Sequence, residues 1–298
     1  VRLGYGVTVL DMLDRGGGML RAGIPEYRLP RDVLDAELGR LEKLGVRFEY
    51  GKKLGKDFSI ESLKRRGFGA VFLGIGAWKG LNLGLEGEEE AEGILDCIAF
   101  LEENNLKGHR KAGERVLVIG GGNAAMDAAR VSIRLGSKVQ LLYRRTRAEM
   151  PANPAEIDAA IEEGVEMSFL VSPVGLVVSD GQVTGLRCIR NELGEPDKSG
   201  RRRPVPVPGS EFTVEADAVI PAVGQAPDMS FAENGSGGIK TGKGGTIAVN
   251  PETLQTSVPE VFAGGDAVTG PATVVEAMAA GQRAATSIHC FLRHLPFS

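Results

Sequence analysis

Residues 115–145 read RVLVIGGGNAAMDAARVSIRLGSKVQLLYRR. The stretch begins with an apolar, mostly β-branched run, Val116–Ile119, which enters a turn of three glycines at 120–122. A helical pattern follows from Asn123 to Arg134, and a second β run spans Val139–Tyr143. Strand, glycine turn, helix and strand in this order predict a complete βαβ nucleotide-binding unit.

The glycine turn and the start of the helix carry residues that suit a pyrophosphate. Gly120 permits the tight turn, and Gly122 lets the backbone approach the phosphates because it has no Cβ. Ala125 stands where the third glycine of a GxGxxG pattern usually lies, and its small side chain lets helix and strand pack closely. The free N–H groups around Asn123 and Ala124 and the helix dipole then face the ligand. The alternative is that these glycines serve only a turn.

The end of the second strand predicts which nucleotide is preferred. NAD sites usually carry an acidic residue there, which binds the ribose 2′-hydroxyl. This chain has Arg144 and Arg145 instead, and two guanidinium groups suit a 2′-phosphate. The sequence therefore predicts NADPH rather than NADH.

Composition excludes several classes of protein. The chain has 298 residues, of which 42% are hydrophobic and 25% charged, as in a soluble protein long enough for two domains. No apolar run reaches the ~20 residues of a membrane span. The net charge of −4 argues against general nucleic-acid binding. The basic run Arg201–Arg203 lies between turn-forming residues, so we interpret it as a solvated hairpin tip rather than a binding patch.

The three cysteines, Cys97, Cys188 and Cys290, lie far apart in the sequence. Without a CxxC pair, we expect neither a dithiol redox centre nor an iron–sulfur cluster bound by this chain alone. Isolated thiols favour a reducing compartment, which predicts a cytoplasmic protein.

Predicted strands alternate with predicted helices along the chain, which indicates an α/β fold with parallel sheets. The βαβ unit lies in mid-chain, and the sequences on both sides read as one further α/β domain. We therefore predict an inserted domain at 108–222, within an outer domain made of 1–107 and 223–298.

A second candidate nucleotide site lies near the C-terminus, where TSVPEVFAGGD spans residues 256–266. Gly265 lets the backbone approach a ligand, and Asp266 can accept a hydrogen bond from a ribityl hydroxyl group. The helix predicted to begin at Thr273, Val274 and Val275 presents a positive dipole end, which suits the partial negative charge of a reduced flavin ring.

These motifs, taken together, resemble those of the pyridine nucleotide–disulfide oxidoreductase superfamily of flavoproteins with two dinucleotide sites. Within it, the chain is most similar to the glutamate synthase small (β) subunit and its relatives, and the similarity covers nearly the whole chain. The matching pieces are GGML at 17–20, GIPEYRLP at 23–30, GA at 76–77, YRR at 143–145, MPA at 150–152, GQAP at 224–227 and AGGD at 263–266.

The resemblance implies two Rossmann-like dinucleotide-binding domains, with the NADPH domain inserted into the FAD domain. Asp11 then binds the FAD adenosine ribose, although a solvated aspartate at a strand end is the alternative. Gly17, Gly18, Ile24 and Pro25 form a loop against the flavin, although a plain turn is the alternative for the two glycines.

The resemblance also assigns the segments that cross between the two domains. Gly76 and Ala77, and likewise Gly224, lie at crossings beside the cofactors. Glu156 matches an acid near the nicotinamide in some relatives. Its alternative role is that of a first-turn glutamate favoured by the helix dipole.

One departure from the family pattern affects the FAD site. In this superfamily a strand and a GxGxxG turn precede the helix that leads to LGYGVTVLD, which spans residues 3–11 here. We therefore expect an N-terminally truncated chain that lacks the FAD pyrophosphate loop, the central strand of its first sheet and an upstream cysteine-rich iron–sulfur module.

The resemblance implies an NADPH-dependent flavoprotein oxidoreductase with FAD and NADP(H) as cofactors. Hydride passes from NADPH to FAD, and electrons pass to an iron–sulfur acceptor protein or a large synthase subunit; any cluster belongs to a partner or to the missing domain. The resemblance also allows a homo-oligomer. The alternatives are a catalytically silent nucleotide-binding or assembly subunit and, disfavoured by the missing CxxC, an enzyme like thioredoxin reductase.

Overall fold

The computed structural model describes residues 1–197, 200–233 and 238–297. These residues form two compact units. The terminal unit consists of residues 1–20, 30–79 and 225–298, and the inserted unit consists of residues 21–29 and 80–224. Within the described residues, no helix is long and apolar enough to cross a membrane.

The inserted unit is built on a parallel sheet with the strand order β12-β5-β6-β7. The strands are β5 (Arg115–Ile119), β6 (Lys138–Tyr143), β7 (Glu166–Phe169) and β12 (Ala218–Pro221). Four of the five residues of β5 and all four of β12 are buried, because both faces of the sheet are covered.

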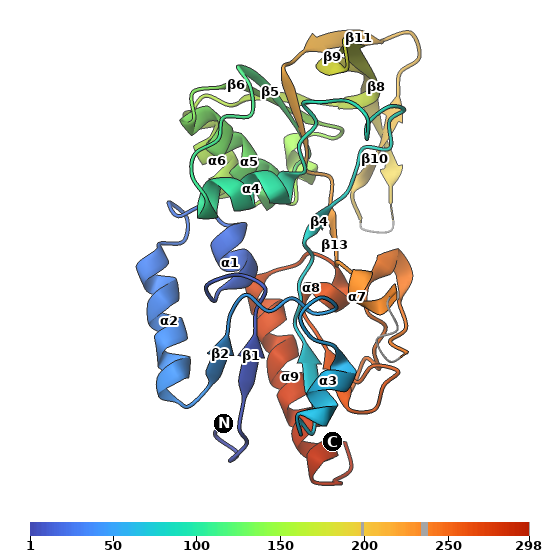
Figure 1. Cartoon of the computed structure of the whole chain (residues 1–298). Coiled ribbons are helices and arrows are strands. Elements are labelled where there is room, and N and C mark those ends of the chain that lie inside the picture. Colours follow the sequence, from blue (N-terminus) through green and yellow to red (C-terminus); the bar gives the residue numbers. More distant parts are fainter. Residues whose placement is uncertain (198–199, 234–237, 298) are drawn as a thin grey trace. The chain divides into compact units, whose positions relative to one another are not determined.

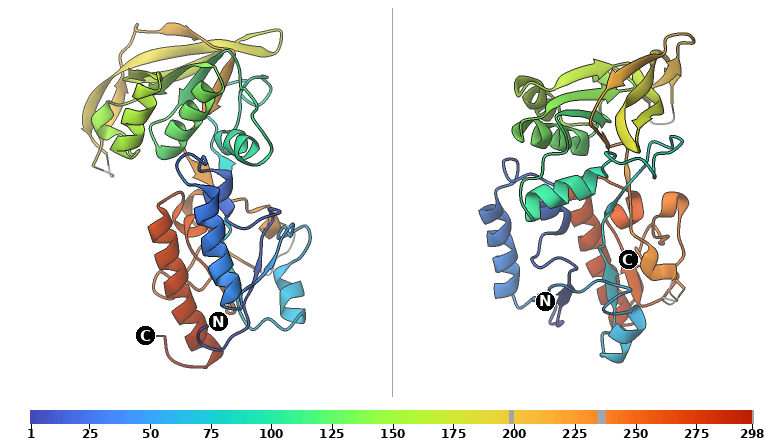
Figure 2. Two further views of the ribbon diagram at one scale, coloured as in Figure 1. Left: turned by 90° about the vertical axis from the view of Figure 1, so that its left-hand side faces the viewer. Right: turned by 45° about the horizontal axis from the view of Figure 1, so that its top comes forward.

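Three helices cover one face of this sheet: α4 (Cys97–Leu106), α5 (Asn123–Arg134) and α6 (Pro154–Glu162). Figure 1 labels them, and in the left view of Figure 2 they are the green helices gathered on one side of the strands. A short 3₁₀ helix, Arg147–Glu149, leads from β6 towards α6.

An antiparallel sheet covers the other face. It consists of β8 (Val171–Ser179), β9 (Gln182–Pro196), β10 (Arg202–Pro206) and β11 (Phe212–Glu215), with β9 paired to the other three. The alternation of side chains along β5 explains the two layers. Val116 and Val118 belong to the core shared with the helices, whereas Leu117 and Ile119 belong to the core shared with the antiparallel sheet.

The terminal unit contains two separate pairs of short parallel strands within the described residues. One pair is β1 (Thr8–Leu10) with β2 (Arg47–Glu49), and the other is β3 (Val71–Leu73) with β14 (Val261–Ala263). Two very short strands, β4 (Lys79–Gly80) and β13 (Gln225–Ala226), lie where the chain passes from one unit to the other.

The helices of the terminal unit differ greatly in length. The long ones are α2 (Arg31–Lys43) and α9 (Val274–Leu292), which Figure 1 shows in blue and red. The short ones are α3 (Ile60–Arg65), α7 (Ser230–Glu233), α8 (Asp266–Thr269) and a 3₁₀ turn at Lys243–Gly245; α1 (Gly18–Ala22) runs from this unit into residues 21–29. The core of the unit lies between α3, β3 and β14 and includes Ile60, Leu73 and Val261.

Residues 21–29, which we call the strap, belong to the inserted unit although the residues before and after them belong to the terminal unit. The domain boundary that the sequence predicted after residue 107 lies inside the inserted unit, because this unit includes residues 80–224. Which unit binds which cofactor stays a prediction at this point.

Candidate dinucleotide sites

The glycine turn between β5 and α5 is shaped by two different constraints. Gly120 has a φ of 151°, and a Cβ there would lie 2.3 Å from the carbonyl oxygen of Ala222. A Cβ on Gly121 would lie 2.5 Å from the ring of Tyr143. The protein itself therefore requires glycine at these two positions.

Gly122 differs from its two neighbours because nothing lies within 4 Å of the place where its Cβ would be. It is the N-cap residue of α5, and no side chain caps this helix. The first N–H groups of a 12-residue helix are thus free of side-chain acceptors beside open space, an arrangement that suits a phosphate.

The other predicted residues of this turn support its shape. Ala125 is fully buried between helix and sheet, and its small side chain permits this close packing. Ala124 is partly buried against the same core. The Oδ1 atom of Asn123 accepts a hydrogen bond from the backbone N–H of Asn153 at 2.9 Å, which fixes the start of α6 beside the turn.

Arg144 and Arg145, at the end of β6, have different environments. Arg144 is exposed, and its carbonyl oxygen accepts a hydrogen bond from the side-chain amide of Asn191. Arg145 is only 4% exposed, and its Nη2 atom donates to Asp197 at 2.6 Å. Its Nε atom donates to the carbonyl oxygen of Arg202 at 2.7 Å. The guanidinium of Arg145 is therefore already engaged by the hairpin between β9 and β10.

Glu156, the predicted acid near the nicotinamide, lies in a network of charges. One carboxylate oxygen of Glu156 is 3.0 Å from the Nε atom of Arg28 in the strap, and the other accepts from Arg130 in α5. The Nη1 atom of Arg28 donates to both carboxylate oxygens of Asp127, at 2.8 and 2.7 Å. Glu156 is therefore an ion-pair partner of two arginines at once.

Sequence reasoning did not predict this network of charges. Asp127 and Arg130 are both less than 10% exposed on α5. Burial raises the pKa of the Asp127 carboxyl to about 6, although the Arg28 guanidinium lowers it. The signal in the sequence was a pair of charged residues on the buried face of an apolar helix, since such groups are rarely buried without a partner.

The ring of Tyr27 fastens the strap further. The guanidinium carbons of Arg130 and Arg134 lie 4.6 and 3.8 Å from its centroid, within the range of cation–π attraction. Both arginines also donate to Glu163, whose pKa falls to about 2 chiefly because of the Arg134 hydrogen bond. Of the two strap residues predicted to contact the flavin, Pro25 is buried and Ile24 is partly buried.

In the terminal unit, the predicted residues of the first βα segment form tight turns. The Oδ1 atom of Asp11 accepts from the backbone N–H of Leu13 at 3.0 Å, and burial raises the pKa of this carboxyl. Gly17 and Gly18 have φ values of 120° and 48°, and a Cβ on Gly18 would meet nothing within 4 Å. The Asp11 carboxylate and the open glycine leave polar and free surface at these turns.

The two predicted crossing segments are also tight turns of the backbone. Gly76 has a φ of 69°, and the neighbouring Ala77 is 1% exposed. Gly224 has a φ of 146°, and a Cβ there would lie 2.9 Å from Leu81. Glycine is required at both positions by backbone conformation, whatever ligand is nearby.

The C-terminal motif places an acid and a helix start in one turn. Gly265 has a φ of 67° and precedes Asp266, whose Oδ1 atom accepts from the backbone N–H of Ala272 at 3.1 Å. Burial raises the pKa of Asp266. The Thr273 hydroxyl caps α9, and apolar side chains project to the surface beyond it: Val274 is 44% and Val275 75% exposed. Exposed valines at a helix start suit an apolar ligand.

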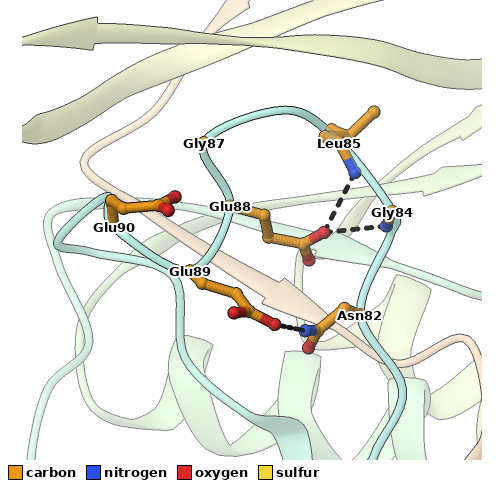
Figure 3. Close-up of a pocket in the computed structure, with 7 residues that line it drawn as sticks. All are labelled: Asn82, Gly84, Leu85, Gly87, Glu88, Glu89 and Glu90. Atoms are coloured by element: carbon orange, nitrogen blue, oxygen red, sulfur yellow. Dashed lines mark hydrogen bonds between the residues drawn. The ribbon is translucent and has the colours of Figure 1, made fainter.

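The hollow drawn in Figure 3 lies away from all these residues in sequence, at 82–90 of the inserted unit. Its Glu88 is 8% exposed and accepts from the backbone N–H groups of Leu83, Gly84 and Leu85. Glu89 accepts from the side chain of Asn82. Glu88 and Glu89 thus close the loop itself, and no acid of this loop was predicted as a site.

Comparison with known proteins decides the family. Residues 29–281 match the family model described as pyridine nucleotide-disulphide oxidoreductase. The chain belongs to this family. The resemblance drawn from the sequence is thereby confirmed at the level of the family, which consists of oxidoreductases that use a pyridine nucleotide.

Several curated proteins are similar along nearly the whole chain. The chain is 50% identical over 293 residues to the NADP(+)-dependent formate dehydrogenase subunit beta of Moorella thermoacetica, covering 97% of this chain and 41% of that protein. It is 39% identical over 305 residues to the glutamate synthase [NADPH] small chain of Escherichia coli, with 96% and 64% covered. The chain spans less than half the length of the first of these relatives.

A solved structure shows the same fold. The structure of Mycobacterium tuberculosis FprA in complex with NADPH aligns with a TM-score of 0.76, covering 97% of this chain and 78% of that one at 19% identity. A thioredoxin reductase of Lactococcus lactis aligns with a TM-score of 0.69, covering 99% and 93% at 21% identity. The predicted α/β fold with Rossmann-like domains is confirmed.

Proposed function

We propose that this chain carries the NADPH-oxidising centre of a flavoprotein that supplies electrons to an iron–sulfur partner. The inserted unit binds NADPH, and the terminal unit binds FAD. The observation that carries the proposal is the start of α5, where open space at Gly122 adjoins a helix without a side-chain cap. When bound, FAD accepts a hydride and releases its electrons one at a time.

The inserted unit suits NADPH along the length of the nucleotide. The backbone from Gly120 to Ala125 faces the pyrophosphate, and Ala125 keeps the helix close to the sheet. Arg144 contributes an exposed guanidinium to the 2′-phosphate. A Cβ at Gly122 would meet nothing within 4 Å, and this open space supports the placement of a phosphate there.

The terminal unit fits a flavin at the start of α9. Asp266 has a second carboxylate oxygen available for a ribityl hydroxyl, since only Oδ1 has a described hydrogen bond. Val274 and Val275 offer apolar surface to the ring, and the helix dipole favours negative charge there. Asp11 and the turns at Gly17 and Gly18 provide polar and open surface for the adenosine end.

Glu156 holds the strap in this proposal. Its two carboxylate oxygens contact two different guanidinium groups, that of Arg28 in the strap and that of Arg130 in α5. The carboxylate therefore keeps the strap residues Ile24 and Pro25 in a fixed position on the inserted unit.

We further propose a cytoplasmic location and a protein partner. Cys97, Cys188 and Cys290 are buried free thiols, as a reducing compartment favours. The names of two relatives describe beta subunits and that of a third a small chain, which supports a partner subunit for this protein. The partner is an iron–sulfur acceptor or a large synthase subunit.

An absorbance spectrum of the purified 298-residue chain, reconstituted with FAD, tests the proposal. We expect a flavin band near ~450 nm that bleaches on anaerobic addition of NADPH, and bleaches much less with an equal amount of NADH. A chain that binds NADPH but shows no flavin band would instead support a catalytically silent nucleotide-binding subunit. The structural feature that favours this alternative is that the two strand pairs of the terminal unit are not joined in one sheet.

A further inference from the structure

The hairpin between β9 and β10 lies directly against the end of β6. Arg145 reaches it through two hydrogen bonds, to Asp197 and to the carbonyl oxygen of Arg202. The side chain of Asn191 in β9 donates to the carbonyl oxygen of Arg144. The two residues that directly follow β6 thus attach this hairpin to the strand end where a Rossmann-like domain binds the adenosine ribose.

Arg202, the first residue of β10, brings a charge that its own contacts do not neutralise. It is exposed, and its guanidinium donates to the backbone carbonyl oxygens of Gly194 at 3.2 Å and of Leu193 at 2.5 Å. These acceptors are uncharged, and a guanidinium has five N–H donors, so several donors stay available. The positive charge of Arg202 is therefore retained.

The charge of Arg202 acts on the turn that follows Arg145. The side chain of Glu149 accepts from the backbone and the hydroxyl of Thr146. These hydrogen bonds lower the pKa of Glu149, and the charge of Arg202 lowers it further. The backbone of Arg202 lies beside Arg145, whose Nε atom donates to its carbonyl oxygen, and Arg145 directly precedes the loop at 146–149.

We propose that Arg202, from the β9–β10 hairpin, joins Arg144 in binding the 2′-phosphate of NADPH, while Arg145 holds the hairpin in place. The proposal rests on the NADPH site of the inserted unit. It adds a specificity-determining residue that lies 58 positions after Arg144 in the sequence. Asp197 pairs with Arg145, whereas Arg144 and Arg202 are exposed and have no described ion pair, so their charges are available to a phosphate.

The assignment gives Arg145 a positioning role. Its guanidinium is buried and paired with Asp197, so it acts on the nucleotide through the hairpin and does not touch the phosphate. This division of roles explains why adjacent arginines have opposite exposures.

The test measures dissociation constants of NADP⁺ and NAD⁺ for the 298-residue chain by titration calorimetry. The readout is the preference, which is the ratio of the NAD⁺ constant to the NADP⁺ constant. Arg202→Gln should lower the preference about tenfold by weakening NADP⁺ alone, because one charged contact is lost. Arg202→Lys keeps the charge without the planar fork and should lower it less.

Arg190→Gln is the matched control. Arg190 is an exposed arginine of β9 in the same sheet, and its guanidinium lies 5.0 Å from the Phe212 ring. The substitution removes the same charge and should leave the preference unchanged. An equal loss in this control would assign the effect to the general field of the sheet and would overturn the role of Arg202.

The outcomes separate this proposal from the proposed function. A wild-type chain without preference for NADP⁺ refutes the NADPH assignment itself. A wild-type preference that survives in both Arg202 variants leaves that assignment intact and overturns the contribution of the hairpin.

Asp197→Asn tests Arg145 independently. Loosening the ion pair should weaken NADP⁺ severalfold if Arg145 only positions the hairpin. Because the lost negative charge by itself favours NADP⁺, binding that is unchanged or tighter would overturn the positioning role of Arg145.

Discussion

The two helix starts that follow glycine turns, at α5 and at α9, are built in opposite ways. α5 has no side-chain cap, and its N-cap residue Gly122 adjoins open space. α9 is capped by Thr273, and the side chain of Glu276 accepts from the backbone N–H of Thr273 in return. Its exposed first turn carries Val275.

The difference indicates two kinds of ligand contact. A helix that receives a phosphate needs its first N–H groups free, whereas one that faces a ring can satisfy them internally and present apolar side chains. The two helix starts therefore match a pyrophosphate and a flavin ring respectively, and substitutions at each start test this comparison.

The largest expected effect is on stability, at Gly120. In Gly120→Ala the new Cβ meets the Ala222 carbonyl oxygen, and the backbone has to leave a φ of 151°. We expect the free energy of unfolding of the inserted unit to fall by about 2–4 kcal/mol. Urea denaturation followed by circular dichroism measures this loss, and a loss below about 0.5 kcal/mol would contradict the described turn.

The next effect is on affinity, at Gly122. Gly122→Asp gives α5 a capping side chain and places a negative charge where the pyrophosphate is proposed to bind. We expect the dissociation constant of NADP⁺ to rise about 100-fold, which is about 2.7 kcal/mol. The free energy of unfolding should stay equal or increase by a few tenths of a kcal/mol.

Gly122→Ala is the control for charge in this prediction, because it adds a Cβ at the same place without a charge and should therefore weaken NADP⁺ less than Gly122→Asp. If the Asp variant bound NADP⁺ as tightly as the wild type, the phosphate site would have to lie elsewhere.

Local sequence was enough to predict the α5 region because its determinants are neighbours along the chain. The helix was expected at Asn123–Arg134, and α5 has these bounds. The strand expected at Val139–Tyr143 begins one residue earlier, at Lys138. Apolar periodicity and glycine turns are properties of short windows, so they are visible without tertiary structure.

Contacts between distant residues could not be predicted in this way. Arg28 and Asp127 are 99 positions apart, and Arg145 and Asp197 are 52 apart. Nothing near Arg145 in the sequence distinguishes it from Arg144, because burial is decided by a hairpin that forms much later in the chain. The pairing of the strap with α5 was hidden for the same reason.

A smaller effect concerns pH and the buried carboxyl of α5. Burial raises the pKa of Asp127 to about 6, above the ordinary value of 3.8. The folded state therefore binds a proton more tightly than the unfolded state, and this group's contribution to stability decreases as pH rises from about 4 to above 6.

Asp127→Asn removes that contribution. The unfolding free energy of the variant minus that of the wild type should therefore increase as pH rises through the same window, whatever constant offset the loss of the Arg28 pair adds. Urea titrations at pH 4.5, 5.5 and 7 measure the difference. A difference that falls with pH would mean that Arg28 dominates the carboxyl and lowers its pKa.

The smallest effect tests the cap of α9. Thr273→Ala removes the hydroxyl that accepts from the backbone N–H of Glu276, and losing an N-cap costs about 1 kcal/mol. Because the residue lies in the terminal unit, the dissociation constant of NADP⁺ should stay unchanged while the midpoint of urea unfolding of that unit falls. Thr273→Ser keeps the hydroxyl and should restore most of the loss. If Thr273→Ala left stability unchanged, the N–H groups of α9 would need no internal cap, and the contrast with α5 would no longer distinguish the two ligands.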